Sequence, residues 1–173
     1  MYKQDISLDS PNTALDKKDI SLDFKNTALD KKDIPLNKTG NYTFQELEAI
    51  IAALRAPDGC PWDREQTFES MKQYLSNETD EVFQAVDSQD TDNLCEELGD
   101  VLLQVLLYSQ IAKDQGLFDI HDVIDAISRK MIRRHPHVFA GITISSPEEG
   151  TAMWEAIKKQ EKMLKSALDA TNP

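Results

Sequence analysis

Apolar residues recur every three or four positions from Thr43 onward, and this spacing is the property that most limits the fold. No Val-, Ile- or Thr-rich run of alternating polarity competes for a strand. The spacing predicts five helices, over 44–55, about 67–88, about 92–115, about 119–134 and from 146 onward, with a loop over 56–63. The sequence therefore predicts an all-α bundle of about five helices.

The ends of these helices carry recognisable signals. Thr43 followed by Glu46 is typical of a capping box, in which each side chain accepts a hydrogen bond from the other residue's backbone N–H. Ser146 and Glu149 predict a second capping box, at the start of the last helix. Gly116 follows the third helix, where a left-handed glycine commonly ends a helix.

The first forty residues are a different kind of sequence, because they repeat a 14-residue unit. Asp5-Ile6-Ser7-Leu8-Asp9 recurs at 19–23 and, in part, at 33–37. Each unit offers few aliphatic side chains, which is too little for a core of its own. We therefore expect a weakly structured N-terminal tail over 1–40, followed by one domain over 41–173. The alternative interpretation is a docking peptide for a partner.

Composition excludes several classes of protein. The 173 residues carry a net charge of −12, which argues against a nucleic-acid partner. No stretch approaches the ~20 apolar residues that span a bilayer, and the N-terminus lacks the apolar run of a signal peptide, so we expect no membrane partner. The two cysteines, Cys60 and Cys95, form no disulfide framework or metal-ligand cluster. The expected location is the reducing cytoplasm.

The negative charge is concentrated in residues 75–100, which hold nine acids and no Lys or Arg. Glu78 and Glu81 are three apart in the second predicted helix, and Glu97 and Asp100 have the same spacing in the third. Side chains at this spacing share one helix face. Because a short link joins the two helices, we expect an antiparallel hairpin that directs four carboxylates into one seam.

Four carboxylates in one seam cannot all stay ionised without a counter-charge, and oxygen ligands of this kind suit Mg²⁺ or Mn²⁺. The alternative is that both pairs face water on amphipathic helices. A di-iron centre is excluded, because it needs Glu-x-x-His and no histidine follows a Glu by three residues. Gly99 lies between Glu97 and Asp100, and we expect it to let the two helix backbones approach closely.

Four motifs occur in order along residues 44–165: Gly59-Cys60-Pro61-Trp62-Asp63, Glu78-x-x-Glu81, Glu96-Glu97-Leu98-Gly99-Asp100, and Arg133-Arg134-His135-Pro136-His137-Val138-Phe139. Together they resemble the MazG family of nucleoside triphosphate pyrophosphohydrolases. The resemblance implies an all-α bundle completed by assembly into a homodimer or higher homo-oligomer. It also implies Mg²⁺-dependent hydrolysis of (deoxy)nucleoside triphosphates between the α- and β-phosphates, a housekeeping activity that yields the monophosphate and pyrophosphate.

By position, Glu78, Glu81, Glu97 and Asp100 match the family's catalytic, metal-binding acids. The family motif reads Glu-Glu-x-x-Glu, and Asn77 stands in place of its first Glu. An amide can ligate through its oxygen or position a water, but it cannot accept a proton as a carboxylate does. The chain is therefore expected either to be an active enzyme or to be a silent, MazG-like dimer that binds a nucleotide or a partner.

The resemblance also assigns substrate contacts. Lys130 and Arg134 share a face of the fourth helix beside Arg133, and they match phosphate-binding positions of the family. Spacing alone equally fits a basic last turn that complements the helix dipole. Trp154 matches a tryptophan that stacks on the base, although a core anchor fits it too. A dUTPase-like or dCTP-specific relative would share the bundle and differ in the base it accepts.

Overall fold

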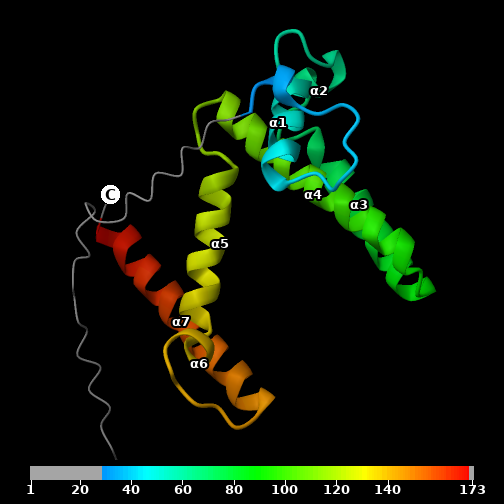
Figure 1. Ribbon diagram of the computed structural model, residues 1–173. Helices are drawn as coiled ribbons and strands as arrows, with labels where there is room; N and C mark the ends of the chain where they lie inside the picture. The colour runs from blue at the N-terminus through cyan, green and yellow to red at the C-terminus, as the bar shows by residue number, and fades with distance from the viewer. Residues whose placement is uncertain (1–28, 172–173) are drawn as a thin grey trace, which may run out of the picture.

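The computed structural model describes residues 29–171, and within this range every regular element is helical (Figure 1). The elements are a 3₁₀ turn η1 (Lys31–Asp33) and the helices α1 (Phe44–Arg55), α2 (Pro61–Glu65), α3 (Met71–Ser88), α4 (Thr91–Asp114), α5 (Ile120–Arg134), α6 (Pro136–Phe139) and α7 (Pro147–Thr171). The all-α prediction is confirmed. The five long helices lie close to the predicted ranges, and no helix in the described range is long and apolar enough to cross a membrane.

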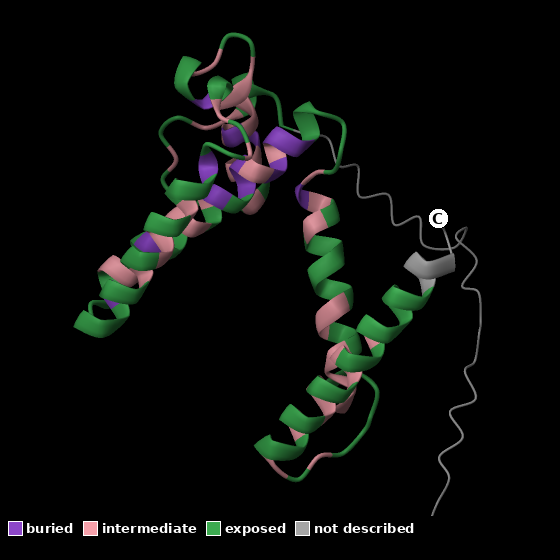
Figure 2. Ribbon diagram, turned by 180° about the vertical axis from the view of Figure 1, so that it is seen from behind, coloured by how far each residue is buried: buried purple, intermediate pink, exposed green. Residues whose placement is uncertain are grey.

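The hydrophobic core lies where α1 packs against the α3–α4 hairpin. Figure 2 shows most of the buried residues gathered at this end of the molecule. Met71 at the start of α3 and Ile111 near the end of α4 are its most enclosed large side chains, at 0% and 1% exposure. The cluster of buried residues consists of Ile51, Met71, Leu106, Leu107, Ile111 and Ile120. This core anchors the hairpin, and the remainder of α3 and α4 projects beyond it (Figure 1).

The predicted capping signals act largely as expected. Thr43 and Glu46 form both hydrogen bonds of a capping box at the start of α1. Gly116 adopts a φ of +68° after α4, and the N–H of Gly116 and Leu117 donate to the carbonyls of Lys113 and Ala112. These two bonds define a Schellman motif, which closes the last turn of the helix.

At the start of α7, only one of the two hydrogen bonds of the predicted capping box is formed. Ser146 Oγ accepts a hydrogen bond from the N–H of Glu149, as expected. The carboxylate of Glu149 instead accepts from the N–H of Ser145, one residue earlier than predicted. Ser146 therefore caps the helix start through its side chain, and Glu149 accepts a hydrogen bond from the backbone of Ser145.

Three local details differ from the prediction. The second long helix begins at Met71 instead of 67, because Thr67 and Ser70 each accept a hydrogen bond from the other's N–H and hold a separate turn. A short helix, α2, occupies part of the predicted 56–63 loop, with Pro61 in its first turn. A second short helix, α6, follows α5 directly after His135.

The expectation for Gly99 is wrong. A Cβ atom placed on Gly99 would have no neighbour within 4 Å, so this glycine does not bring α3 and α4 together. Several apolar positions of the predicted helices are exposed, because the hairpin projects beyond the part covered by α1. Phe83 and Val86 of α3 and Leu98 of α4 are more than half exposed.

The two ends of the described range lie in different surroundings. α5 leaves the core at Ile120 and reaches α6 and α7, which pack against its far end, away from the α3–α4 hairpin (Figure 1). At the other end, Lys31 pairs with Asp58 at 2.9 Å and Lys38 pairs with Glu46 at 2.6 Å. The last repeat unit thus lies against α1, whereas the units at 5–9 and 19–23 lie outside the described residues, and their predicted weak structure stays a prediction.

Candidate active site

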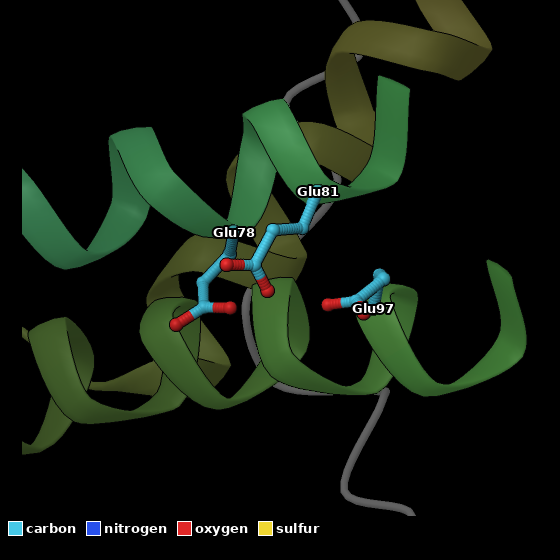
Figure 3. Close-up of side chains that lie close together, drawn as sticks. All are labelled: Glu78, Glu81 and Glu97. Carbon is cyan, nitrogen blue, oxygen red and sulfur yellow. The ribbon is translucent and has the colours of Figure 1, made fainter. Parts of the chain in front are cut away.

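Three carboxylates meet in the seam between α3 and α4. Glu78 and Glu81 come from α3 and Glu97 from α4, and each offers an oxygen atom within 4.8 Å of the others (Figure 3). The three-residue spacing places Glu78 and Glu81 on one face of α3. The antiparallel hairpin brings this face next to Glu97 of α4. Glu97 is buried, Glu78 is half-buried and Glu81 is exposed, so the group opens to solvent on one side.

The fourth predicted acid, Asp100, lies just outside this group but close enough to act on it. Burial raises the pKa of Glu78, and the negative charges of Asp100 and Glu81 add to this effect. Burial also raises the pKa of Glu97, again helped by the charges of Glu81 and Asp100. None of the ion pairs formed among residues 29–167 neutralises these four acids. Such a donor set fits a divalent cation, which would relieve the mutual repulsion.

Sequence reasoning missed Gln104, which completes the seam. Its side chain is 4% exposed, and its Nε2 donates to Glu78 Oε1 at 3.4 Å. Its Oε1 is enclosed and has no hydrogen-bond partner among the described residues. The available signal was its position four residues after Asp100, on the same face of α4. In native proteins, a buried amide oxygen without a protein partner generally accepts a hydrogen bond from a water molecule or binds an ion.

Asn77, the position that departs from the family motif, lies one residue before Glu78 near the middle of α3. Its side chain is exposed, whereas that of Glu78 is half-buried. It therefore lies on a solvent-exposed part of α3, next to Glu78 in the sequence.

The predicted phosphate-binding residues lie at the junction of α5 and α7. Arg133 Nε donates to Glu161 Oε1 at 2.5 Å, and Arg134 Nη2 donates to Glu161 Oε2 at 2.6 Å. The two arginines lower the pKa of Glu161 to about 2. Lys130 lies one turn before Arg134 on α5 and is half-buried. Sequence reasoning missed Glu161, whose one signal is its place seven residues after Trp154 on the same face of α7.

Trp154 lies in an aromatic cluster, next to one of these arginines. The Arg134 guanidinium is 5.0 Å from the centre of the Trp154 ring, and the His135 ring is also 5.0 Å from it, edge to face. His135 Nδ1 donates to the carbonyl of Met131 at 2.6 Å, so this histidine secures the end of α5. Trp154 also lines a cavity of about 610 Å³, together with His135, His137 and residues of α7.

The acids and the basic residues do not meet within one chain. The carboxylate group belongs to the α3–α4 hairpin, while Lys130, Arg133, Arg134 and Trp154 belong to the α5–α7 arm, and Figure 1 shows the two on diverging parts of the molecule. A site that uses both groups needs either a change of arrangement or a second subunit.

Comparison with known proteins identifies the family of this chain. The sequence profile of the MazG nucleotide pyrophosphohydrolase domain matches residues 66–139, which span α3 to α6. The crystal structure of a mazG-related protein from Thermotoga maritima superposes with a TM-score of 0.55 at 34% identity, covering 65% of this chain and 96% of that one. This chain belongs to the MazG family.

Curated relatives extend the match. The chain is 48% identical to the nucleoside triphosphate pyrophosphohydrolase/pyrophosphatase MazG of Thermotoga maritima, over 79% of this chain and 52% of that protein. It is 48% identical to the nucleoside triphosphate pyrophosphohydrolase of Escherichia coli K12, over 71% and 48%, and 53% identical to the uncharacterised YabN of Bacillus subtilis, over 70% and 25%. The chain spans about half the length of these relatives or less.

Proposed function

We propose that this MazG-family protein hydrolyses (deoxy)nucleoside triphosphates to the monophosphate and pyrophosphate in the presence of Mg²⁺, as a nucleotide-pool housekeeping enzyme of the cytoplasm. The observation that carries the proposal is the group of carboxylate oxygens from Glu78, Glu81 and Glu97 within 4.8 Å of one another. The family membership supports it, because several relatives bear the name nucleoside triphosphate pyrophosphohydrolase. No nucleic-acid or membrane partner forms part of the proposal.

The acids have one shared task. Glu78, Glu81, Glu97 and Asp100 are the catalytic residues that would hold Mg²⁺, or Mn²⁺ in its place. When bound, such an ion supplies positive charge to the phosphates and favours deprotonation of water. Gln104 keeps Glu78 oriented through its 3.4 Å hydrogen bond. In the reaction, a water oxygen bonds to the α-phosphorus while the bond to the bridging oxygen breaks, so pyrophosphate leaves.

The basic residues would offset the negative charge of the substrate. A triphosphate brings about four negative charges, and an acidic seam alone would repel it. Lys130, Arg133 and Arg134 would bind the phosphates and offset the charge that develops on the leaving pyrophosphate. Trp154 would stack on the base, with its ring already supported by Arg134.

Assembly would bring these two groups together. The acids and the basic residues lie on diverging arms of one chain, so a second copy would contribute the missing half of each site (Figure 1). Leu98, Leu102 and Val105 form an exposed apolar stripe on α4, at the i, i+4 and i+7 spacing of a helix-packing face. We therefore propose a homodimer or a higher homo-oligomer.

A pyrophosphate-release assay tests the function. The full chain would be supplied with Mg²⁺ and a panel of ribo- and deoxynucleoside triphosphates, beside the Glu97→Gln variant and the matched control Glu96→Gln. Glu96 is the exposed neighbour of Glu97 on α4. We expect release by the wild type and by Glu96→Gln, and a loss of at least 100-fold in Glu97→Gln. Equal rates in all three proteins, or none in any, would exclude the proposal.

Asn77 supports a second candidate, a MazG-like dimer that binds a nucleotide or partner without turning it over. Its exposed amide replaces a carboxylate beside Glu78 and cannot accept a proton. The Asn77→Glu variant separates the two functions. Turnover that appears only in this variant would show a silent native protein, whereas similar rates in both would show that the four acids suffice.

A further inference from the structure

One of the histidines that line the cavity beside Trp154 has no part in the proposed metal site or in the proposed phosphate contacts. His137, in α6, lines this cavity of about 610 Å³ together with His135 and Trp154. Its ring packs edge to face against His135, with the ring centres 5.6 Å apart. The Nδ1 atom of His137 is enclosed and has no hydrogen-bond partner among the described residues.

The enclosed Nδ1 decides how this ring can act. A neutral imidazole carries one N–H and one lone pair, and its partners choose the tautomer. Buried N–H groups without an acceptor are rarer than buried acceptors without a donor. The proton of His137 is therefore best placed on Nε2. Because Nδ1 is enclosed, Nε2 is also the ring nitrogen through which His137 can reach a ligand in the cavity.

The second histidine of the cavity cannot share this task equally. His135 Nδ1 donates to the carbonyl of Met131 at 2.6 Å, which fixes that N–H within α5 and leaves the other nitrogen as an acceptor. The cavity thus has one imidazole that donates, His137, and one that accepts. Its volume and aromatic walls suit a planar heterocycle, since ligand pockets of this size are commonly lined by aromatic rings with few polar groups.

We propose that His137 is a specificity-determining residue, and that its Nε2–H donates a hydrogen bond to an exocyclic oxygen of a nucleobase held in this cavity. The inference rests on the proposed function for the class of ligand. It adds a preference for an oxo group at position 4 of a pyrimidine or position 6 of a purine, so uracil over cytosine and hypoxanthine over adenine. The two bases of each pair differ at this exocyclic group, an oxygen in one and an amino group in the other, and in whether the adjacent ring nitrogen carries a hydrogen.

Binding of monophosphates tests this preference without any hydrolysis. Calorimetric titration of the full chain would compare IMP with AMP, and UMP with CMP. A correct donor contact is worth about three- to tenfold in affinity, so we expect both oxo nucleotides to bind tighter by that factor. If the chain releases no pyrophosphate but retains this preference, the proposed reaction fails and the inference about His137 stands. If the chain releases pyrophosphate but binds these nucleotides without the preference, the proposed reaction stands and the inference about His137 fails.

Variants assign the preference to His137. We expect His137→Phe, which keeps a flat ring without nitrogen, to bring both affinity ratios close to one. His137→Gln serves as the second variant should Phe disturb folding, and its amide, which can present either a donor or an acceptor, should also remove the preference. His121→Phe is the matched control, since His121 lies near Glu48 at the other end of α5. Ratios unchanged in both His137 variants, or a wild-type preference for amino bases, would overturn the proposal.

Discussion

Arg134 of α5 donates hydrogen bonds from both Nε and Nη2 to one carboxylate oxygen of Glu161 in α7, at 3.1 and 2.6 Å. The Arg134 side chain is only 15% exposed, and its guanidinium also lies over the ring of Trp154. Charge-assisted contacts in partly buried surroundings are stronger than those between exposed side chains. This contact therefore holds α7, and with it Trp154, against α5.

Removing the carboxylate should loosen this arm. We expect Glu161→Gln to lower the midpoint of thermal unfolding at pH 7 by several degrees. The matched control is Asp125→Asn, which breaks an arginine pair with Arg129 on the exposed face of α5 and should change the midpoint little. Differential scanning calorimetry measures both, and equal effects of the two variants would contradict the prediction.

The same contact predicts a pH dependence. The arginines lower the pKa of Glu161 to about 2, below its ordinary value of 4.5. A group with a lowered pKa adds stability that is complete above the ordinary value and is lost as the pH falls through the lowered one. We expect the difference in unfolding midpoint between wild type and Glu161→Gln to be constant above pH 5 and to vanish near pH 2. A difference that persists below pH 2 would exclude the ion pair as its source.

The acid seam predicts a stability effect of opposite sign. Burial and neighbouring charges raise the pKa of Glu97, so its contribution to stability is lost as the pH rises through that raised value. At pH 7 the metal-free cluster is therefore destabilising, and Glu97→Gln should raise the unfolding midpoint by a few degrees. Mg²⁺ should raise the midpoint of the wild type and of Glu96→Gln but not that of Glu97→Gln. A lower midpoint in metal-free Glu97→Gln would contradict this account.

Cation affinity should depend on pH for the same reason. Metal binding needs deprotonated ligands, and the pKa values of Glu78 and Glu97 are both raised. Protons therefore compete with the cation for these two carboxylates at pH values above the usual titration range of Glu. We expect the affinity for Mn²⁺, followed by electron paramagnetic resonance, to rise from pH 5 to pH 7 with release of protons. An affinity that is constant over this range would show that other groups bind the ion.

The core prediction concerns Met71, which is 0% exposed and packs at the start of α3. Met71→Ala should lower the free energy of unfolding by about 2–5 kcal/mol, because it removes buried apolar surface and leaves a cavity. Met163→Ala on α7 is the control, since Met163 is 65% exposed and its loss should cost little. Chemical denaturation with urea compares the two.

The glycine of the Gly59-Cys60-Pro61-Trp62-Asp63 motif predicts a further difference. A Cβ at Gly59 would collide with the backbone carbonyls of Ala53 and Leu54, which the loop crosses closely after α1. Gly59→Ala should therefore destabilise the protein strongly. Gly40→Ala, at a position with no neighbour within 4 Å, should not. Similar urea midpoints for the two variants would show that the loop adapts without cost.

The sequence by itself determined the features that arise from interactions between residues close together in the chain. Apolar periodicity and capping residues such as Thr43 and Gly116 fixed the long helices, because these signals act within one or two turns. The spacing of the acids, with the short link to α4, predicted a seam of four carboxylates, and the structure groups three of them, Glu78, Glu81 and Glu97.

Only the tertiary structure decided what depends on distant segments. The partnership of Arg134 with Glu161 joins residues 27 apart, and Gln104 reaches Glu78 across 26. The open space at Gly99 and the separation of the acids from the basic arm also depend on how whole helices are placed. Helical periodicity tells which face of a helix a residue occupies, but the packing of the helices decides what that face meets.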